Sequence, residues 1–527
     1  MLCFQILILS LFIYKTNLYE NSGFPLDDSW IHQSIARNLG EHFELSFNKG
    51  ELTTGSTSLL WTFILSLNFA IFKIDPVYYT LALSLLLYLL TGIFLYKLLE
   101  KQIDELTSAI IVILFSITGT VVFFVFSGME ISLFYFLSIT SIYFFEEKRF
   151  LLSGFLCGLL ALTRPEGLGL FVILAIAELY NSLPKIEKRK LLFLIIPPIV
   201  FFGISTFINF YICGSLLPTT FKGRKWFYGL KDKSFYLDFE HTWSFLSSWY
   251  LRIKMYTFGI KKSESLIRDL SKNCINYLLF LSVLIGSLGI LKDGLLTSKD
   301  KKGKGIFLLF IWSIALNFSY IIFLPASGHA GRYQSINYLF IALTLVLGIK
   351  YTVEKLFKRL RFVTKITWLA WIILLAIFFN NFLFWSEITK INIFHINNTN
   401  KKMGLYLKSH LPENEKVAVF DVGAIKFFSN QHIVDLGGLT DVKFVPYLYS
   451  RNPIPYLKNN GVRYVVLPYG FDNRTMMGWS VGLLKEDNKI RLTKIKEFST
   501  PEHIWEFGKD AIYNADPKQV LLKIVYR

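Results

Sequence analysis

Long apolar segments alternate with short polar ones through the first 386 residues, and this alternation is the strongest pattern in the chain. A transmembrane helix needs about 20 mainly apolar residues, so each long apolar segment predicts a membrane crossing. By this criterion we expect about eleven crossings, at residues 1–19, 77–97, 107–126, 131–145, 150–163, 166–180, 191–212, 274–292, 305–324, 335–350 and 366–385. The predicted fold is mainly α, a polytopic transmembrane helical bundle.

Basic residues gather between the apolar segments and predict the orientation of the bundle. They form clusters at residues 148–149, 185–190, 299–304 and 355–365. The positive-inside rule puts such clusters in the cytoplasm, and the crossings after residue 77 then alternate correctly. The polar segments before residue 77 lie outside only if the apolar segment 57–73 does not cross. We therefore predict a re-entrant or interface-lying helix there, with an ordinary crossing as the alternative.

A smaller domain is expected after the bundle. From about residue 387, short apolar runs bounded by polar turns replace the long ones. Such runs predict strands, which we expect at residues 416–420, 432–435, 463–468 and 519–526, with a helix after Asp421. Strands alternating with helices suggest an α/β domain. We expect a transmembrane module over residues 1–386, with outer loops at 20–76 and 213–273, and an extracytoplasmic α/β domain over residues 387–527.

The composition agrees with a membrane protein. Hydrophobic residues make up 53% of the 527 residues and the mean hydropathy is +0.45, which is unusual for a soluble protein. The formal net charge of +18 could indicate nucleic-acid binding. However, the basic residues lie between apolar segments, where the positive-inside rule accounts for them. The chain has no Walker sequence and no CxxC spacing, so neither an ATP-driven pump nor a zinc site is expected.

Five polar motifs fall on the outer side of the predicted bundle. They are Asp27-Asp28, Ser127–Glu130, Thr163–Gly167, Leu217–Arg224 and Gly328–Tyr333. Charged side chains at a membrane edge are costly to bury and are therefore candidates for function. Five such motifs on one face of a bundle predict a site rather than scattered loops.

These motifs, taken in order, resemble those of the polytopic GT-C glycosyltransferases, and in particular the bacterial AftB-like group, which contains a terminal arabinofuranosyltransferase. The resemblance lies in Leu26–Ile31, Ala36–Leu39, Asn48–Glu51, Gly55–Trp61, Ser127–Glu130, Thr163–Gly167, Leu217–Phe221, Arg332-Tyr333, Asp421–Ile425 and Asp435–Asp441, so it spans nearly the whole chain. The sequence departs from the group's pattern at Trp30, Thr54–Thr57 and Thr219. These positions lie near the expected sugar-binding region, so arabinose is not carried over as the sugar.

The resemblance implies a membrane glycosyltransferase of the inner (plasma) membrane. Its donor would be a sugar on a polyprenyl phosphate, and its acceptor an extracytoplasmic glycan, glycolipid or glycoprotein of the cell envelope. An acceptor hydroxyl would attack the anomeric carbon with help from a general base while the lipid phosphate leaves, and inversion is the expected outcome. No nucleic-acid partner is expected.

Asp27 and Asp28 are the predicted catalytic residues. Two adjacent carboxylates repel each other, which raises the proton affinity of one and favours its use as a general base. We expect Asp27 to be the base and Asp28 to orient the acceptor or a metal ion, and the reverse assignment stays open. Alternatively, one of the two caps the helix that follows. A divalent cation is not required, since Asp27, Asp28 and Glu130 would form only a sparse oxygen site.

Cationic side chains are the predicted phosphate ligands, because arginine can bind phosphate through two parallel hydrogen bonds. The candidates, in order, are Arg332, then Arg164 and Arg224, then Lys222, and the alternative for each is snorkelling toward water. The other expected substrate-binding residues are His329, Tyr333, Glu130 and Glu166. The two glutamates could bind sugar hydroxyls or favour the positive ends of helices.

A transporter or flippase of lipid-linked sugars is the competing hypothesis. Transporters often show internal repeats and polar groups near the middle of the membrane. In this chain no repeat is visible and the polar motifs lie at one edge. The sequence therefore favours the enzyme, and an envelope scaffold would leave the aspartate pair and the arginines without a role.

Overall fold

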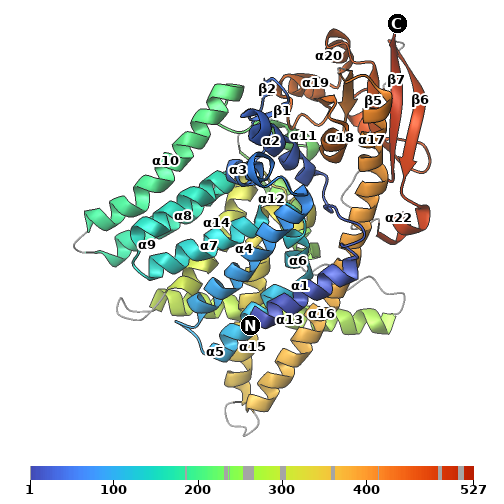
Figure 1. Cartoon of the computed structure of the whole chain (residues 1–527). Coiled ribbons are helices and arrows are strands. Elements are labelled where there is room, and N and C mark those ends of the chain that lie inside the picture. Colours follow the sequence, from blue (N-terminus) through green and yellow to red (C-terminus); the bar gives the residue numbers. More distant parts are fainter. Residues whose placement is uncertain are drawn as a thin grey trace.

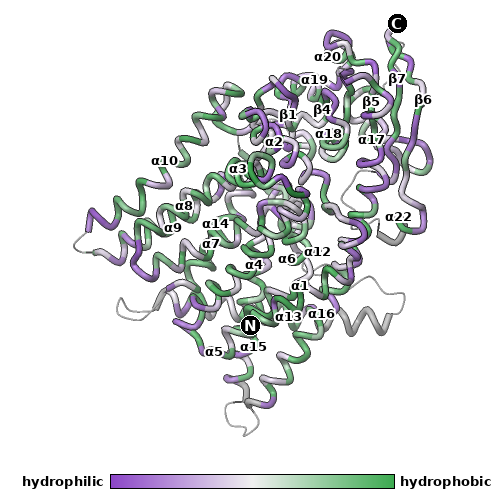
Figure 2. The backbone as a smooth tube through the Cα atoms, viewed as in Figure 1, coloured by the Kyte–Doolittle hydropathy of each residue, from purple (hydrophilic) through white to green (hydrophobic). Residues whose placement is uncertain are grey.

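A bundle of apolar helices carries a smaller α/β unit at one end (Figure 1). The computed structural model describes residues 2–183, 187–230, 235–236, 238–252, 266–296, 304–357, 363–413, 415–484, 489–508 and 516–527. Figure 2 shows hydrophobic residues through most of the bundle and hydrophilic ones gathered in the C-terminal part. The predicted mainly helical architecture with a C-terminal sheet-containing domain is confirmed.

Six helices in the described residues are long and apolar enough to cross a membrane. They lie in α4 (Pro76–Leu99), α10 (Lys188–Cys213), α13 (Leu266–Leu296), α14 (Gly305–Phe323), α15 (Ile336–Phe357) and α16 (Val363–Ile396). Helix α10 exposes large apolar side chains along its length, including Ile196, Val200 and Phe207. Such a surface is unfavourable in water and favourable in lipid, which identifies a membrane protein.

The other predicted crossings are helical but shorter. They correspond to α1 (Leu2–Thr16), α7 (Ile131–Glu146), α8 (Phe150–Thr163) and α9 (Leu168–Asn181). The apolar segment 57–73 forms α3 (Leu59–Leu67) and the π-helical turn η1 (Asn68–Phe72), which together are shorter than 18 residues. Helices α8 and α9 are no longer than this segment, so its length does not separate the re-entrant or interface placement from an ordinary crossing, and the placement stays a prediction.

The predicted crossing 107–126 is not one continuous helix. It is divided at Thr118 into α5 (Glu105–Ile117) and α6 (Gly119–Val125), which are bent by 62°. The Gly119 amide donates to Asn381 Oδ1 of α16 at 2.9 Å, and a Cβ at Gly119 would lie 2.7 Å from Trp385. A neighbouring side chain thus takes the place of the regular helical bond, which is a known cause of kinks.

The C-terminal sheet has the strand order β4-β3-β5-β7-β6. Its strands are β3 (Lys416–Val419), β4 (His432–Asp435), β5 (Tyr464–Tyr469), β6 (Ile490–Ser499) and β7 (Lys518–Tyr526). Strands β4, β3 and β5 are parallel, whereas β7 is antiparallel to β5 and β6. The four predicted strands and the helix after Asp421, α18 (Val422–Ser429), are confirmed. Strand β6 was not predicted because its charged, largely exposed residues give no apolar run.

The first loop joins the bundle to this domain. After α2 (Asp28–His42) the loop forms a hairpin of β1 (Ser46–Asn48) and β2 (Glu51–Leu52). The Asn48 side chain makes two hydrogen bonds to the backbone of Ile433 in β4, donating at 2.9 Å and accepting at 3.0 Å. The loop and the sheet are therefore held together by side-chain amide bonds to main chain.

The long loop 213–273 contributes α11 (Thr220–Phe227) and α12 (Phe239–Arg252). Residues 231–234, 237 and 253–265 of this loop lie outside the described residues. So do parts of the predicted basic clusters, at residues 185–186, 299–303 and 358–362. Trp249 of α12 is buried and its indole nitrogen donates to Gln334 Oε1 at 3.1 Å, while Phe239 and Trp243 are exposed. Helix α12 thus has one face against the bundle and one facing outward.

Candidate active site

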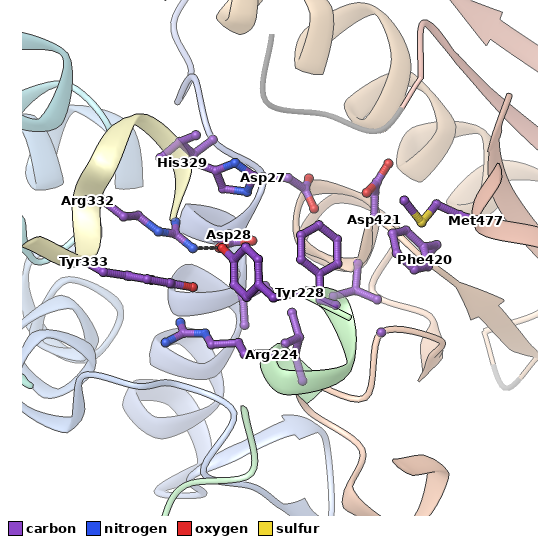
Figure 3. Close-up of a pocket in the computed structure, with 16 residues that line it drawn as sticks. Asp27, Asp28, Arg224, Tyr228, His329, Arg332, Tyr333, Phe420, Asp421 and Met477 are labelled. Atoms are coloured by element: carbon purple, nitrogen blue, oxygen red, sulfur yellow. Dashed lines mark hydrogen bonds and ion pairs between the residues drawn. The ribbon is translucent and has the colours of Figure 1, made fainter. Parts of the chain in front are cut away.

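A cavity of about 270 Å³ lies between the helical bundle and the C-terminal domain (Figure 3). Residues far apart in the chain line it: Leu26, Asp27, Asp28, Ile31, Arg224, Phe227, Tyr228, His329, Arg332, Tyr333, Phe420, Asp421, Val422, Gly437, Leu439 and Met477. Figure 3 shows His329, Arg332 and Arg224 on one side and Asp421, Phe420 and Met477 on the other, with Asp27 and Asp28 between them. We call the two sides the cationic wall and the domain wall.

The cationic wall is built on η4 (His329–Gln334), whose backbone is coiled tightly. Gly328, Ala330 and Gly331 have φ values of 69°, 54° and 76°. A left-handed backbone is easy for glycine and uncommon for alanine, so the surrounding structure must hold Ala330 in place. The Trp249 ring lies under this turn, since a Cβ at Gly331 would be 2.9 Å from it. Glycines at 328 and 331 therefore let the loop aim Arg332 into the cavity.

Arg332 is held by one ion pair and keeps further donors available. Its Nη2 donates to Asp28 Oδ2, and its side chain is only 3% exposed. Nε and Nη1 are buried and donate to no described residue. Buried guanidinium donors without partners are costly, and they match the oxygens of a phosphate in geometry and charge. Arg332 can thus bind an anion while it stays paired with Asp28.

Arg224 and Tyr333 complete the cationic wall. The Arg224 guanidinium lies 5.0 Å from the centre of the Tyr333 ring, and that of Arg332 lies 5.4 Å from it. Burial alone would raise the pKa of Tyr333, but Arg224 and Arg332 outweigh this effect and lower it. Tyr228 packs edge-on against Tyr333, with ring centres 6.3 Å apart. The wall therefore offers phenol and guanidinium donors side by side.

Asp27 binds the N-terminus of a helix from the other domain. Its Oδ1 accepts from Asn400 Nδ2 and the Ala424 amide, both at 2.9 Å, and its Oδ2 accepts from the Gly423 amide at 2.7 Å. It stands at the N-cap position of α2 without capping that helix; it serves the N-terminus of α18 instead. Burial raises the pKa of Asp27, although these three hydrogen bonds oppose the shift.

Asp28 has the opposite electrostatic setting. Burial alone would raise its pKa, but Arg332 and His329 outweigh burial and hold the pKa well below its usual value. The two adjacent carboxylates are therefore separated in proton affinity. Asp27 is the better proton acceptor, and Asp28 remains an anion that holds Arg332.

Three further predicted residues form a buried support beneath η4. Arg164 donates to the carbonyl of Arg332 at 3.0 Å and forms ion pairs with Glu130 at 3.1 Å and Glu166 at 3.4 Å. Glu166 accepts from the Tyr320 hydroxyl at 2.5 Å, and the Tyr320 ring stacks on Tyr333 with centres 5.6 Å apart. These contacts position the cationic wall from behind.

A second, mainly apolar cavity of about 470 Å³ adjoins the first. Apolar side chains that line it include Leu168, Phe202, Leu217, Phe221, Phe323 and Leu324. Arg224 lines both cavities, and Arg164 and Glu166 also reach the second one. The pair of cavities thus offers a polar chamber next to an apolar chamber, with an arginine between them.

The structure brings most of the predicted site residues together. Asp27, Asp28, Arg224, His329, Arg332 and Tyr333 line the polar cavity, while Arg164 and Glu166 line the apolar one and Glu130 binds Arg164. Lys222 is exposed and lines neither cavity. Within the described residues, no group of three or more His, Cys, Asp or Glu side chains could hold a metal ion.

Sequence reasoning did not assign Tyr228, Asp421 or Met477 to the site. Asp421 carried a signal, because it is the second residue after β3, and ligands in open α/β sheets gather beyond the carboxyl ends of parallel strands. Burial and the nearby Asp27 carboxylate raise the pKa of Asp421 to about 8. Tyr228 and Met477 lie in segments without a recognisable pattern, so only the fold reveals them.

Solved structures with a similar arrangement of elements include an archaeal oligosaccharyltransferase and ArnT. The Archaeoglobus fulgidus oligosaccharyltransferase in its apo form matches with a TM-score of 0.57 and 11% identity, over 96% of this chain and 81% of that one. ArnT from Cupriavidus metallidurans bound to undecaprenyl phosphate matches with a TM-score of 0.52 and 9% identity, over 98% and 97%. The chain has the GT-C fold. At these identities the likeness establishes the fold alone.

A further match is AglB from Archaeoglobus fulgidus in complex with an inhibitory peptide and a dolichol-phosphate, with a TM-score of 0.53 and 10% identity, over 98% of this chain and 88% of that one. Residues 390–514 match a domain of unknown function (DUF8728). No curated protein matches the sequence. The narrower resemblance to the AftB-like group stays a prediction.

Proposed function

We propose that this protein is a glycosyltransferase that moves a sugar from a polyprenyl-phosphate donor to an acceptor hydroxyl at the outer face of the plasma membrane. One observation carries the proposal: a polar cavity with an aspartate pair facing two arginines opens beside an apolar cavity, and Arg224 lines both. This is the arrangement that a lipid-linked sugar phosphate requires. Two solved structures of the same fold were determined with undecaprenyl phosphate and with dolichol-phosphate.

The donor fits the two cavities in one direction. Its first prenyl units lie among the apolar side chains around Phe221 and Phe323, where burial of apolar surface favours them. Its phosphate lies at Arg224 and Arg332, and the buried Nε and Nη1 of Arg332 can donate to two of its oxygens. The sugar then extends toward Asp27 and Asp28, since they line the polar cavity beyond the arginines.

The transfer step uses the two ends of the cavity. Asp27 takes the proton of the acceptor hydroxyl as its oxygen forms a bond to the anomeric carbon. The bond between that carbon and the phosphate oxygen breaks, and the oxygen keeps the electron pair. Arg332, Arg224 and the Tyr333 hydroxyl stabilise the charge that develops on the departing lipid phosphate. Attack opposite the leaving group inverts the anomeric configuration.

The orientation follows from the charges between the helices. We propose about eleven crossings, an interfacial or re-entrant α3, and basic loops on the cytoplasmic side. The aspartate pair and the C-terminal domain, residues 387–527, then lie outside the plasma membrane. The acceptor is accordingly an envelope glycan, glycolipid or glycoprotein.

Sugar transfer in nanodiscs tests the proposal. Purified full-length protein is offered radiolabelled undecaprenyl-phosphate hexoses and pentoses one at a time, together with envelope extracts as acceptor. The variants are Asp27→Asn and Arg332→Lys, and the matched controls are Asp472→Asn and Arg474→Lys, which are exposed residues of the C-terminal domain. We expect wild type and both controls to transfer one donor sugar, and both site variants to lose most activity while remaining folded.

Two results would count against the proposal. If Asp27→Asn and Arg332→Lys transfer sugar as fast as wild type, the polar cavity takes no part in the reaction. If the labelled lipid moves between leaflets in liposomes and no sugar is transferred to any acceptor, the flippase hypothesis replaces the enzyme hypothesis.

A further inference from the structure

The domain wall of the polar cavity lies apart from the arginines that we propose to bind the donor phosphate. Phe420, Asp421, Leu439 and Met477 come from the C-terminal domain, and Figure 3 shows the labelled ones across the cavity from Arg224 and Arg332. These four residues place one carboxyl group among apolar side chains. The matched domain of unknown function includes all four.

Asp421 is not engaged as a helix cap. It precedes α18, yet its side chain accepts no hydrogen bond from that helix, because Asp27 occupies the amides of Gly423 and Ala424. Its Oδ2 accepts from Gln519 Nε2 at 2.6 Å. Among the described residues no cation pairs with Asp421, and its Oδ1 accepts no hydrogen bond. Gln519 is fully buried in β7, so it fixes the direction of the carboxyl group.

We propose that Asp421, Phe420, Leu439 and Met477 form the acceptor subsite of this enzyme and that the acceptor is a neutral sugar. The inference rests on the proposed function. A sugar carries hydroxyls on neighbouring carbons, so one hydroxyl can lie at Asp27 for attack while a second binds Asp421. Its apolar ring face can pack on Phe420 and Met477, as aromatic rings and thioethers both favour such contacts.

Charge and hydroxyl count separate this acceptor from others. A uronic acid or a phosphorylated sugar would bring a negative charge to a subsite of Phe420, Asp421, Leu439 and Met477, which contains no cation, and an unpaired charge is unfavourable in a buried cavity. A serine or threonine side chain has a single hydroxyl and cannot serve both carboxyl groups. Near neutral pH, the raised pKa of Asp421, about 8, leaves it largely protonated, so it can donate to a sugar oxygen as well as accept.

Saturation-transfer difference NMR tests the subsite directly, because it detects weak binding and does not require turnover. The probes are p-nitrophenyl glycosides of neutral hexoses and pentoses, with p-nitrophenyl β-glucuronide as the charged counterpart, added to full-length protein in nanodiscs. The variants are Asp421→Ala and Asp421→Asn, and the control is Asp472→Ala, an exposed carboxylate of the same domain. Binding of undecaprenyl phosphate is measured in parallel.

We expect sugar-ring saturation for at least one neutral glycoside in wild type and Asp472→Ala, and weaker binding of the glucuronide. Asp421→Ala should weaken glycoside binding about threefold to tenfold, as loss of a hydrogen bond between neutral groups would, and Asp421→Asn should weaken it less. Binding of undecaprenyl phosphate should not change in either variant.

The inference is overturned if no neutral glycoside binds, if the glucuronide binds as well as the glucoside, or if folded Asp421→Ala binds glycosides like wild type. Loss of undecaprenyl-phosphate binding in Asp421→Asn would place the residue on the donor side instead. If wild type binds glycosides through Asp421 but binds no undecaprenyl phosphate and transfers no sugar, the proposed function fails and a glycan-binding site remains.

Discussion

The two neighbouring aspartates differ in their contacts and so in their expected roles. Asp27 accepts three neutral hydrogen bonds, whereas Asp28 is paired with the Arg332 guanidinium. General-base catalysis is worth about 10²–10⁴-fold, so Asp27→Asn should lower kcat by that factor with little change in donor KM. Initial rates at saturating donor and acceptor measure the effect. A fall of less than threefold, about 0.7 kcal/mol, would remove Asp27 as the base.

Asp28→Asn should weaken binding of the donor rather than slow proton transfer. The variant leaves the buried Arg332 guanidinium without its anionic partner, so the arginine is no longer held toward the cavity. We expect donor KM to rise about tenfold, the change that corresponds to 1.4 kcal/mol, and kcat to fall less than in Asp27→Asn. The reverse pattern in the two variants would exchange the roles of the two carboxylates.

Asp421 makes stability depend on pH. Its pKa is raised from 3.8 to about 8 in the folded protein, so the folded state binds a proton that the unfolded state has released between these values. The stability that this group contributes is fully present below pH 3.8 and is lost as pH rises through about 8. Asp421→Asn cannot ionise. Its melting temperature relative to wild type should therefore be higher at pH 9 than at pH 5, and an unchanged difference would contradict the assignment.

Much of the site could be predicted from residue types and order. A paired carboxylate and arginines at a membrane edge are costly unless they are used, so Asp27, Asp28, Arg224 and Arg332 could be selected from the sequence. The different roles of these residues could not be predicted, because they depend on contacts with residues hundreds of positions away in the chain. Asp27 binds α18, and Arg164 donates to the backbone carbonyl of Arg332.

At the scale of elements, α12 supports the loop that carries Arg332. Trp249 packs under Gly331 and bonds to Gln334, so Trp249→Ala would leave a void beneath η4. Misplacement of a binding group by about 1 Å can cost about 10²-fold. We expect kcat/KM for the donor to fall between about tenfold and 10²-fold. Trp243→Ala on the exposed side of the same helix is the control, and equal effects of the two variants would argue against a supporting role.

The close approach of α18 to Asp27 requires glycine at position 423. A Cβ there would collide with the Asp27 backbone carbonyl and lie 2.8 Å from its Oδ2. Gly423→Ala should therefore push the helix away from the base, lowering kcat and destabilising the fold by about 1–3 kcal/mol. Gly203→Ala in α10 meets open space and should be neutral. Thermal unfolding and initial rates of the two variants give the comparison, and wild-type behaviour of Gly423→Ala would contradict the contact.

Elements were predicted well where the apolar pattern is long or regular. The six long helices and four of the five C-terminal strands follow from it. The break at Thr118 was missed because the whole stretch is apolar and the cause lies in Asn381 and Trp385 of another helix. Strand β6 was missed for the opposite reason, since pairing with β7 and not burial defines it.

At the scale of the whole molecule, the proposed orientation can be checked by cysteine labelling. Lys148 and Lys458 are exposed, the first after α7 and the second in α20 (Ile454–Asn459). In a background without native cysteines, an impermeant maleimide should label Lys458→Cys on intact cells, and Lys148→Cys only after permeabilisation. Labelling of Lys148→Cys alone on intact cells would indicate the opposite orientation. Labelling of both variants on intact cells would contradict the proposed topology.

The position of β7 in the sheet means that the cavity is completed only when the end of the chain has folded. This strand follows all the other strands in the chain, yet it lies between β5 and β6 and supplies the Gln519 that holds Asp421. Asp27, which leaves the ribosome first, obtains its partners only when α18 has folded against it. Under the proposed function, a chain that ends before residue 519 would therefore lack the residue that orients Asp421, and we expect it to be inactive.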